Sequence, residues 1–221
     1  MLITVEGIDG SGKNTLACGL STVLAASHDV KMVASPGYDR TETGKLIGRY
    51  LSGNFDLGND SPYALSLLFA LDRQEGQPDL RKWLAEGKLV IADRYAASNI
   101  AYQAARADDP DESARVRQFV LDLEYQRLST IVPAYNIWLD IPVDFSRELI
   151  ARKGKRDYVS TTYDKFEADG NLMRKVSEEY RELAKDDRYG KWIRIEPVQE
   201  GALRAAEAIL DEALGRLDLY S

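Results

Sequence analysis

The chain has 221 residues, of which 44% are hydrophobic and 29% are charged, and its formal net charge at pH 7 is −7. This length and composition fit one globular α/β domain, and the acidic balance argues against nucleic acid or an anionic membrane as the main partner. Cys18 is the only cysteine and His28 the only histidine, which excludes an intrachain disulfide and a cysteine or histidine metal cluster. The sequence has no recognisable export signal and no run of about 18 apolar residues, so we expect a cytoplasmic enzyme.

Five apolar segments have the length and pattern of buried strands, and helices are predicted between them. The strands lie at residues 2–5, 31–34, 89–93, 135–140 and 191–195. The helices lie at residues 16–24, 43–52, 61–75, 78–86, 96–106, 112–128, 143–151, 163–185 and 198–214. Strands that alternate with helices imply a five-stranded parallel sheet flanked by helices, within one domain over residues 1–221. We expect Cys18, in the first helix, to pack as a small core residue.

A glycine-rich turn joins the first strand to its helix. It matches the phosphate-binding pattern GxxxxGK[ST], except that Asn14 replaces the hydroxyl residue, and it reads Gly7-Ile8-Asp9-Gly10-Ser11-Gly12-Lys13-Asn14-Thr15. Backbone N–H groups of such a turn surround phosphate oxygens, and Lys13 supplies a mobile positive charge. The sequence therefore predicts a P-loop NTPase fold that binds a nucleoside triphosphate through residues 7–15. The alternative is a glycine turn with a solvated lysine.

The third predicted strand ends in Asp93-Arg94. An acid at this position in P-loop enzymes often binds the metal or its water, and the guanidinium that follows can hold a phosphate. The next helix places polar and aromatic side chains on one face, at Tyr95, Ser98, Asn99 and Tyr102. This face can contact a base, a sugar or a phosphate. The alternative is a stripe of hydrogen bonds between helices.

Phe69, Asp72 and Arg73 share a face of the helix predicted over residues 61–75. An aromatic ring beside a guanidinium can stack on a nucleobase and hydrogen-bond its edge. The alternative is that Phe69 packs in the core while Asp72 and Arg73 form an exposed pair.

A basic segment follows the helix over residues 143–151, with cations at Arg152, Lys153, Lys155 and Arg156. A transferring phosphoryl group needs several cations, and within residues 7–15 the only one is Lys13. We expect residues 152–161 to act as a lid that supplies the remaining charge. The alternative is a solvated run of charges.

Together these motifs resemble the thymidylate kinase family. The most specific stretches are residues 6–13, residues 70–73, and Asp93-Arg94-Tyr95 with the helix face after it. The resemblance is closest to actinobacterial members and includes the basic lid of the bacterial type. It implies a nucleoside-monophosphate-kinase fold that phosphorylates dTMP to dTDP with ATP and Mg²⁺, and a homodimer.

The resemblance also implies roles for single residues. Those expected to contact dTMP are Asp9, Tyr38, Phe69, Arg73, Arg94, Ser98, Asn99, Tyr102 and Phe166. Phe69 would stack on thymine, Arg73 would hydrogen-bond its carbonyl, and Asn99 would lie at the base edge. Those expected to take part in catalysis are Asp9, Lys13, Arg94, Arg152 and Arg156. Asp9 and Glu167 would bind the metal.

Departures from the family are few. Ser35 stands where close relatives carry an aromatic residue, and Phe166 replaces a tyrosine. Asn14 leaves no hydroxyl beside Lys13, which fits metal binding through Asp9 and Glu167. Two other activities remain open on these residues: a kinase that acts on another nucleoside or nucleotide, and a P-loop ATPase module without a phosphoryl acceptor.

Overall fold

The computed structural model describes residues 1–55, 61–153 and 170–219. Its sheet has five parallel strands in the order β2-β3-β1-β4-β5. They are β1 (Leu2–Glu6), β2 (Val30–Ala34), β3 (Leu89–Asp93), β4 (Tyr135–Leu139) and β5 (Lys191–Ile195). The predicted five-stranded parallel sheet flanked by helices is therefore confirmed.

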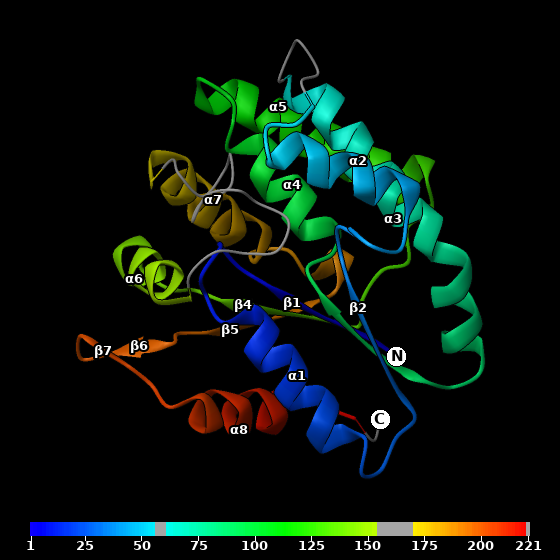
Figure 1. Ribbon diagram of the computed structural model, residues 1–221, viewed down its shortest axis with the longest axis vertical. Coiled ribbons are helices and arrows are strands. Elements are labelled where there is room, and N and C mark those ends of the chain that lie inside the picture. Colours follow the sequence, from blue (N-terminus) through cyan, green and yellow to red (C-terminus); the bar gives the residue numbers. More distant parts are fainter. Residues whose placement is uncertain (56–60, 154–169, 220–221) are drawn as a thin grey trace.

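Helices cover both faces of this sheet (Figure 1). On one side lie α1 (Lys13–Leu24) and α8 (Ala206–Arg216), which contact each other. On the other side lie α3 (Pro62–Ala85), α4 (Ala96–Ala104), α5 (Pro110–Leu121) and α7 (Gly170–Leu183), with α2 (Glu42–Leu51) packed against α3. The remaining long helix, α6 (Val143–Lys153), follows β4.

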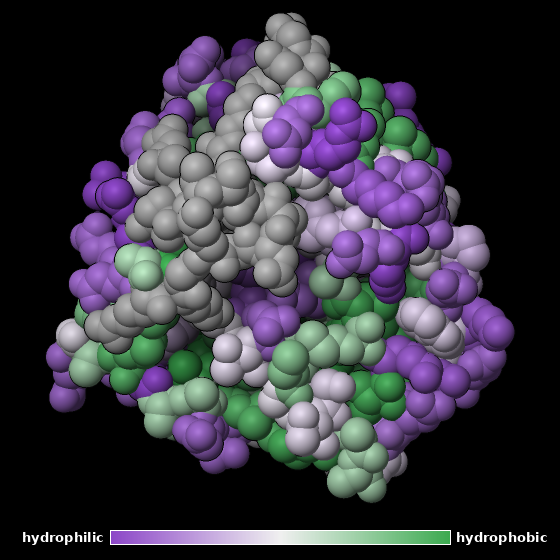
Figure 2. All heavy atoms as spheres, viewed as in Figure 1, coloured by the Kyte–Doolittle hydropathy of each residue, from purple (hydrophilic) through white to green (hydrophobic). Residues whose placement is uncertain are grey.

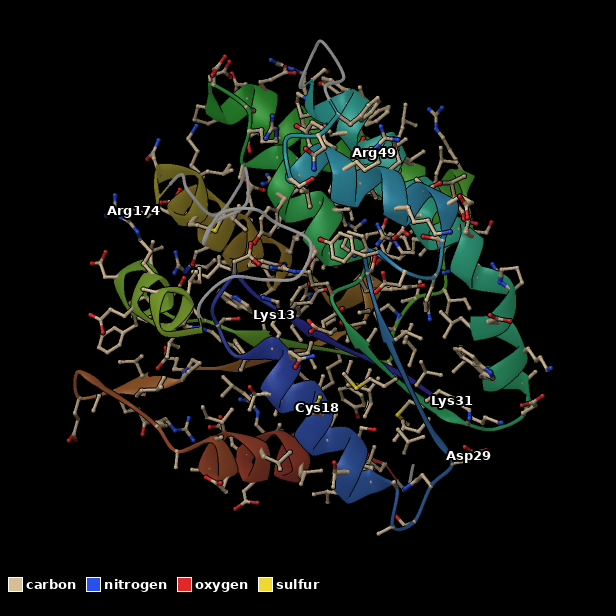
Figure 3. All side chains as sticks on the ribbon, viewed as in Figure 1. Lys13, Cys18, Asp29, Lys31, Arg49 and Arg174 are labelled. Carbon is tan, nitrogen blue, oxygen red and sulfur yellow. The ribbon has the colours of Figure 1, made fainter. Side chains whose placement is uncertain are left out.

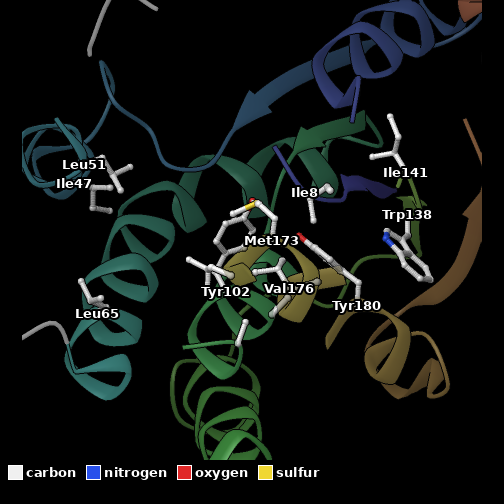
Figure 4. Close-up of a cluster of buried hydrophobic side chains, with 14 of the residues drawn as sticks. Ile8, Ile47, Leu51, Leu65, Tyr102, Trp138, Ile141, Met173, Val176 and Tyr180 are labelled. Atoms are coloured by element: carbon white, nitrogen blue, oxygen red, sulfur yellow. The ribbon is translucent and has the colours of Figure 1, made fainter. Parts of the chain in front are cut away.

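The core has one main hydrophobic cluster on each side of the sheet. Ile3 and Val5 pack with Leu20 of α1 on one side. On the other side, Trp138 packs with α4 and α7, as the close-up in Figure 4 shows. Every residue of β1 is buried, as expected for a central parallel strand covered on both faces. This packing fixes the carboxyl end of β1, where the glycine-rich turn begins.

Helix α3 corrects one prediction. It is continuous over 24 residues with Pro78 inside it, whereas the sequence predicts one helix that ends at residue 75 and another that begins at Pro78. Proline removes one helical hydrogen bond, but side chains on both parts of α3 hold it in place. Leu80 is buried, and Gln77 donates to Tyr95 Oη at 2.9 Å and accepts from the backbone N–H of Ile131 at 3.1 Å.

Two other helix predictions change near their ends. Residues 198–203 are not helical but form a hairpin of β6 (Val198–Gln199) and β7 (Ala202–Leu203), because Glu200 and Gly201 both have positive φ and make a tight turn. The helix predicted over residues 112–128 is α5 followed by a π-helical segment, η1 (Asp122–Arg127). Residues 163–169 of the helix predicted before Lys185 lie outside the described residues.

Surface exposure corrects the expectation for Cys18. This residue is exposed, because α1 turns Leu16, Ala17 and Leu20 toward the sheet and Cys18 away from it. Figure 2 shows hydrophilic side chains gathered over α2 and α3, with hydrophobic ones more frequent over α1 and β2. Within the described residues, none of the helices is long and apolar enough to cross a membrane.

Candidate active site

The glycine-rich turn lies between β1 and α1. Gly7, Gly10 and Gly12 have φ values of 140°, 75° and 93°. A Cβ on Gly7 would lie 2.8 Å from the carbonyl oxygen of Leu139, and one on Gly10 would lie 2.4 Å from that of Ser146. Steric contact and backbone conformation therefore both require glycine at these two positions.

Helix α1 begins directly at this loop. Its N-cap is Gly12, and no side chain caps it. The first N–H groups of the helix are thus available to an anion, and the positive end of the helix dipole adds to the attraction. The loop can bind the phosphate oxygens of a nucleotide through its backbone.

Lys13 is the cation of the loop, and Figure 3 shows it at the start of α1. Its side chain is buried, and Nζ donates to the carbonyl oxygen of Ile8 at 2.7 Å. Burial and then the charge of Arg94 lower the pKa of Lys13 to about 8. An anionic phosphate bound in the loop would favour the charged form and raise that pKa again.

Arg94 connects the loop to α4. Its φ of 66° is left-handed, which is uncommon for a residue with a side chain. Nη1 donates to the carbonyl oxygen of Gly7 at 2.9 Å and to Ser98 Oγ at 3.0 Å. Nη2 donates to Asp9 Oδ1 at 2.5 Å and to Tyr102 Oη at 3.1 Å. The loop and the helix face predicted from the sequence therefore meet at one guanidinium.

Glu6 is a site residue that the sequence reasoning missed. Its side chain is fully buried and accepts hydrogen bonds from Tyr95 N at 2.8 Å, Ser98 Oγ at 2.6 Å and Tyr180 Oη at 3.0 Å. Burial raises the pKa of Glu6 even though these hydrogen bonds oppose the shift. The signal in the sequence was an acid at the end of a strand that is otherwise apolar.

The pair Asp72 and Arg73 is buried, with exposed fractions of 3% and 5%, so the alternative of an exposed pair is wrong. Asp72 accepts from the backbone N–H of Gly37 at 3.1 Å and from the hydroxyl of Thr41. Arg73 is ion-paired with Glu124, which the sequence reasoning also missed. Its Nη2 lies 2.5 Å from Glu124 Oε1.

A single cavity of about 370 Å³ joins these groups. It is lined by the predicted residues Asp9, Lys13, Tyr38, Phe69, Arg73, Arg94, Ser98, Asn99 and Tyr102, together with Gly10, Gly12 and Asn14 of the loop. The loop residues Gly7, Ile8, Ser11 and Thr15 do not line it. On α4, the residues Ser98, Asn99 and Tyr102 make hydrogen bonds to other elements, as the alternative interpretation predicts, and they also line the cavity.

Some predicted residues cannot be placed. The predicted lid, with Arg152 and Arg156, and also Phe166 and Glu167 lie outside the residues whose side chains the structure describes. Among the described residues, no group of three or more metal-binding side chains is assembled. Asp93 does line the cavity, and its Oδ1 is buried without a hydrogen-bond partner in the described part of the chain.

A backbone-built phosphate loop that shares a cavity with buried cations, hydroxyls and an aromatic ring is the arrangement of a P-loop phosphotransferase. Comparison with known proteins agrees. The sequence model described as "Thymidylate kinase" matches residues 5–202. The chain belongs to the thymidylate kinase family, a family of transferases.

Relatives from bacteria and archaea are similar to the chain to about the same degree. A thymidylate kinase of Mycobacterium tuberculosis (strain CDC 1551 / Oshkosh) is 32% identical over 87% of this chain and 90% of its own length. A probable thymidylate kinase of Thermococcus onnurineus (strain NA1) is 36% identical over 83% of this chain and 84% of its own. These identities do not single out the actinobacterial members that the sequence motifs resemble.

A solved structure also superposes on the chain. It is a thymidylate kinase from Candida albicans, whose title refers to broad substrate specificity. The TM-score is 0.73 at 26% identity, over 97% of this chain and 89% of that one. The fold is therefore that of the thymidylate kinase P-loop proteins.

Proposed function

We propose that the chain transfers the γ-phosphoryl group of ATP to the phosphate of dTMP, which yields dTDP. The observation that carries this proposal is the position of Arg94. Its guanidinium bonds the carbonyl of Gly7 at 2.9 Å and Asp9 at 2.5 Å, and it lines the same cavity as Arg73 and Asn99. A phosphate held by Arg94 would lie beside the loop that holds the donor.

The donor would bind along residues 7–15. The N–H groups of the loop and of the first turn of α1 would hold the phosphates of ATP, and Lys13 would neutralise the outer ones. Lys13 gives up its contact with the carbonyl of Ile8 at little cost, because the new partner is a charged oxygen.

The acceptor would occupy the rest of the cavity. Phe69 would stack on the thymine ring, with Arg73 and Asn99 at the base edge. Tyr102 would lie near the sugar. The remaining proposed contacts, toward the sugar and the phosphate, are Asp9, Tyr38, Arg94 and Ser98. Phe166, outside the described residues, is proposed for the same pocket.

Phosphoryl transfer in this site needs no general base. The attacking oxygen belongs to a phosphate and is already anionic, so catalysis consists of alignment and charge neutralisation. Lys13 and Arg94 supply positive charge from the described residues. We propose that residues 152–161 form a lid within a single kinase domain, and that Arg152 and Arg156 complete this charge.

Mg²⁺ fits the carboxylates beside the loop. Asp9 and Asp93 both line the cavity, Oδ1 of Asp93 has no hydrogen-bond partner among the described residues, and carboxylate oxygens are preferred ligands of Mg²⁺. We propose that Asp9 holds the ion together with Glu167. When bound, the ion neutralises negative charge on the phosphates.

A homodimer is proposed through α3. Leu67 and Leu71 lie one turn apart on this helix and are 45% and 52% exposed, so together they form an apolar pair on its surface. All residues of α4 are buried, so α4 does not offer such a face. Light scattering of the purified chain would measure its mass in solution, and a monomeric mass would contradict this proposal.

A cytoplasmic location is proposed because that compartment supplies ATP.

The test of the function is a panel of acceptors with ATP. A coupled assay across dTMP, dUMP, CMP, GMP and thymidine should give the highest kcat/KM for dTMP. A preference for thymidine would indicate a nucleoside kinase. ATP hydrolysis that does not respond to any acceptor would indicate an ATPase module.

A further inference from the structure

Glu124, in the π-helical segment η1, contacts Arg73 and Asn99, two residues that line the cavity. It is fully buried. Its carboxylate accepts hydrogen bonds from Arg73 Nε at 3.1 Å and Nη2 at 2.5 Å, from Asn99 Nδ2 at 2.9 Å, and from Thr130 Oγ1 at 2.9 Å. One buried acid thus holds two of the side chains proposed to contact the base. π-Helical turns occur frequently at functional sites.

The contact with Glu124 fixes the orientation of the Asn99 amide. Nδ2 donates one proton to Glu124 Oε1 and the other to the carbonyl oxygen of Ser66 at 3.0 Å. A turned amide would place its oxygen against a carboxylate and a carbonyl, which is repulsive. Oδ1 therefore stays the free end of the amide, and it has no hydrogen-bond partner among the described residues. Asn99 is 3% exposed and lines the cavity.

The same carboxylate orients Arg73. Nε and Nη2 are both directed at Glu124, which leaves Nη1 on the side of Ser35 Oγ at 3.0 Å. Arg73 and Ser35 also line the cavity. The side chains that line the base end of the cavity therefore carry a donor on Arg73 and an unpartnered acceptor on Asn99, whose Oδ1 is buried in the described residues.

A donor from Arg73 beside an acceptor from Asn99 complements the hydrogen-bonding edge of thymine and opposes that of cytosine. Thymine presents an acceptor at O4 next to a donor at N3–H, whereas cytosine presents a donor at N4 next to an acceptor at N3. A buried donor that faces another donor, or an acceptor that faces another acceptor, makes no hydrogen bond and still bears the full cost of desolvation. We propose that Glu124 is a positioning residue that sets this donor–acceptor order and so makes the site select thymine over cytosine nucleotides. The proposal rests on the proposed function.

The experiment compares kcat/KM for dTMP, dUMP and dCMP in the wild type and in variants. In the wild type, the charge of Glu124 holds Arg73 and prevents rotation of the Asn99 amide. Glu124→Gln removes this charge, so the ratio of kcat/KM for dTMP to that for dCMP should fall at least tenfold. dUMP has the same O4 and N3–H edge as dTMP, so the dTMP to dUMP ratio should stay within about twofold. The KM for ATP should also stay within about twofold.

Two further variants separate orientation from packing. Glu124→Asp keeps the charge but changes the shape, and it should retain more of the dTMP to dCMP ratio than Glu124→Gln. A packing role predicts the reverse order, because glutamine is the closer isostere. Glu179→Gln is the matched control, since Glu179 is also buried and ion-paired, at 2.5 Å to Arg117, away from the cavity. It should leave the ratio unchanged.

Two results would overturn the proposal: a dTMP to dCMP ratio unchanged in Glu124→Gln, or a dTMP to dUMP ratio that falls equally. If Glu124→Gln does not fold, Asn99→Leu replaces it. This variant removes the acceptor and leaves the ion pair of Arg73, and it must also lower the dTMP to dCMP ratio. A wild type that does not phosphorylate dTMP would instead refute the proposed function, so the two failures are distinguishable.

Discussion

The two halves of the cavity are built by different means. The donor half is a backbone turn in which glycines hold N–H groups toward the site, and its one cation, Lys13, hydrogen-bonds the carbonyl of Ile8. The acceptor half is built from side chains, and buried carboxylates at Glu6, Asp72 and Glu124 hold them in place. Backbone N–H groups recognise phosphate charge in any nucleotide. Side chains in fixed orientations can recognise one base, so selectivity belongs to the acceptor half.

This contrast predicts that a substitution in one half of the cavity impairs the function of that half and leaves the other half intact. The largest effect is expected from Lys13→Ala, which removes the only cation of the loop. The kcat/KM for ATP should fall roughly 10³-fold, because charge on the transferring phosphoryl group loses its partner. Binding of dTMP without ATP, measured by calorimetry, should change less than twofold. Loss of dTMP binding in this variant would show that the halves are not independent.

A smaller but still large effect is expected from Arg94→Lys. An ammonium cannot replace the fork that reaches Gly7 and Ser98 through Nη1 and Asp9 through Nη2. Because Arg94 belongs to both halves, kcat/KM for dTMP should fall roughly 10²-fold and kcat should fall with it. Steady-state kinetics with either substrate varied would measure this, and near-normal kinetics would remove Arg94 from the mechanism.

The donor half should also depend on pH. Only charged Lys13 attracts phosphate, and in the free chain its pKa is lowered to about 8. The kcat/KM for ATP should therefore fall as pH rises through about 8, approaching tenfold per pH unit above it. In kcat the fall should come at higher pH, because bound phosphate raises the pKa. In Lys13→Arg, whose guanidinium does not titrate in this range, any remaining activity should not fall as pH rises through about 8.

The smallest effect is expected in the acceptor half, on stability. Burial raises the pKa of Glu6 above its ordinary 4.5, so the folded state favours the protonated acid. Its contribution to the free energy of unfolding is full below pH 4.5 and is lost as pH rises through the raised value. Urea unfolding across this range should show that the free energy of unfolding of the wild type, taken relative to that of Glu6→Gln, falls as pH rises. A relative free energy that rises with pH would mean that Glu6 is ionised in the folded state.

The donor half was the easier half to predict from the sequence. The glycines, Lys13 and the helix after them are contiguous, and the strand before them is apolar. The residues proposed for the acceptor were found because helical spacing places Asn99 and Tyr102 on one face. Glu124 could not be found in this way, since it is 51 residues from Arg73 in the sequence and is brought to it only by the packing of η1 beside α3. The helix break predicted at Pro78 was wrong for a related reason, because tertiary contacts outweighed the local effect of proline.

The exposed thiol of Cys18 gives the chain a single chemical handle. It lies one helical turn after Asn14 of the phosphate loop, with its Sγ 3.9 Å from Asn14 Oδ1, and the chain has no other cysteine. A maleimide dye would therefore attach at one place without any prior mutagenesis. Because this place adjoins the loop but points away from the sheet, the fluorescence of the dye should report nucleotide arrival in real time.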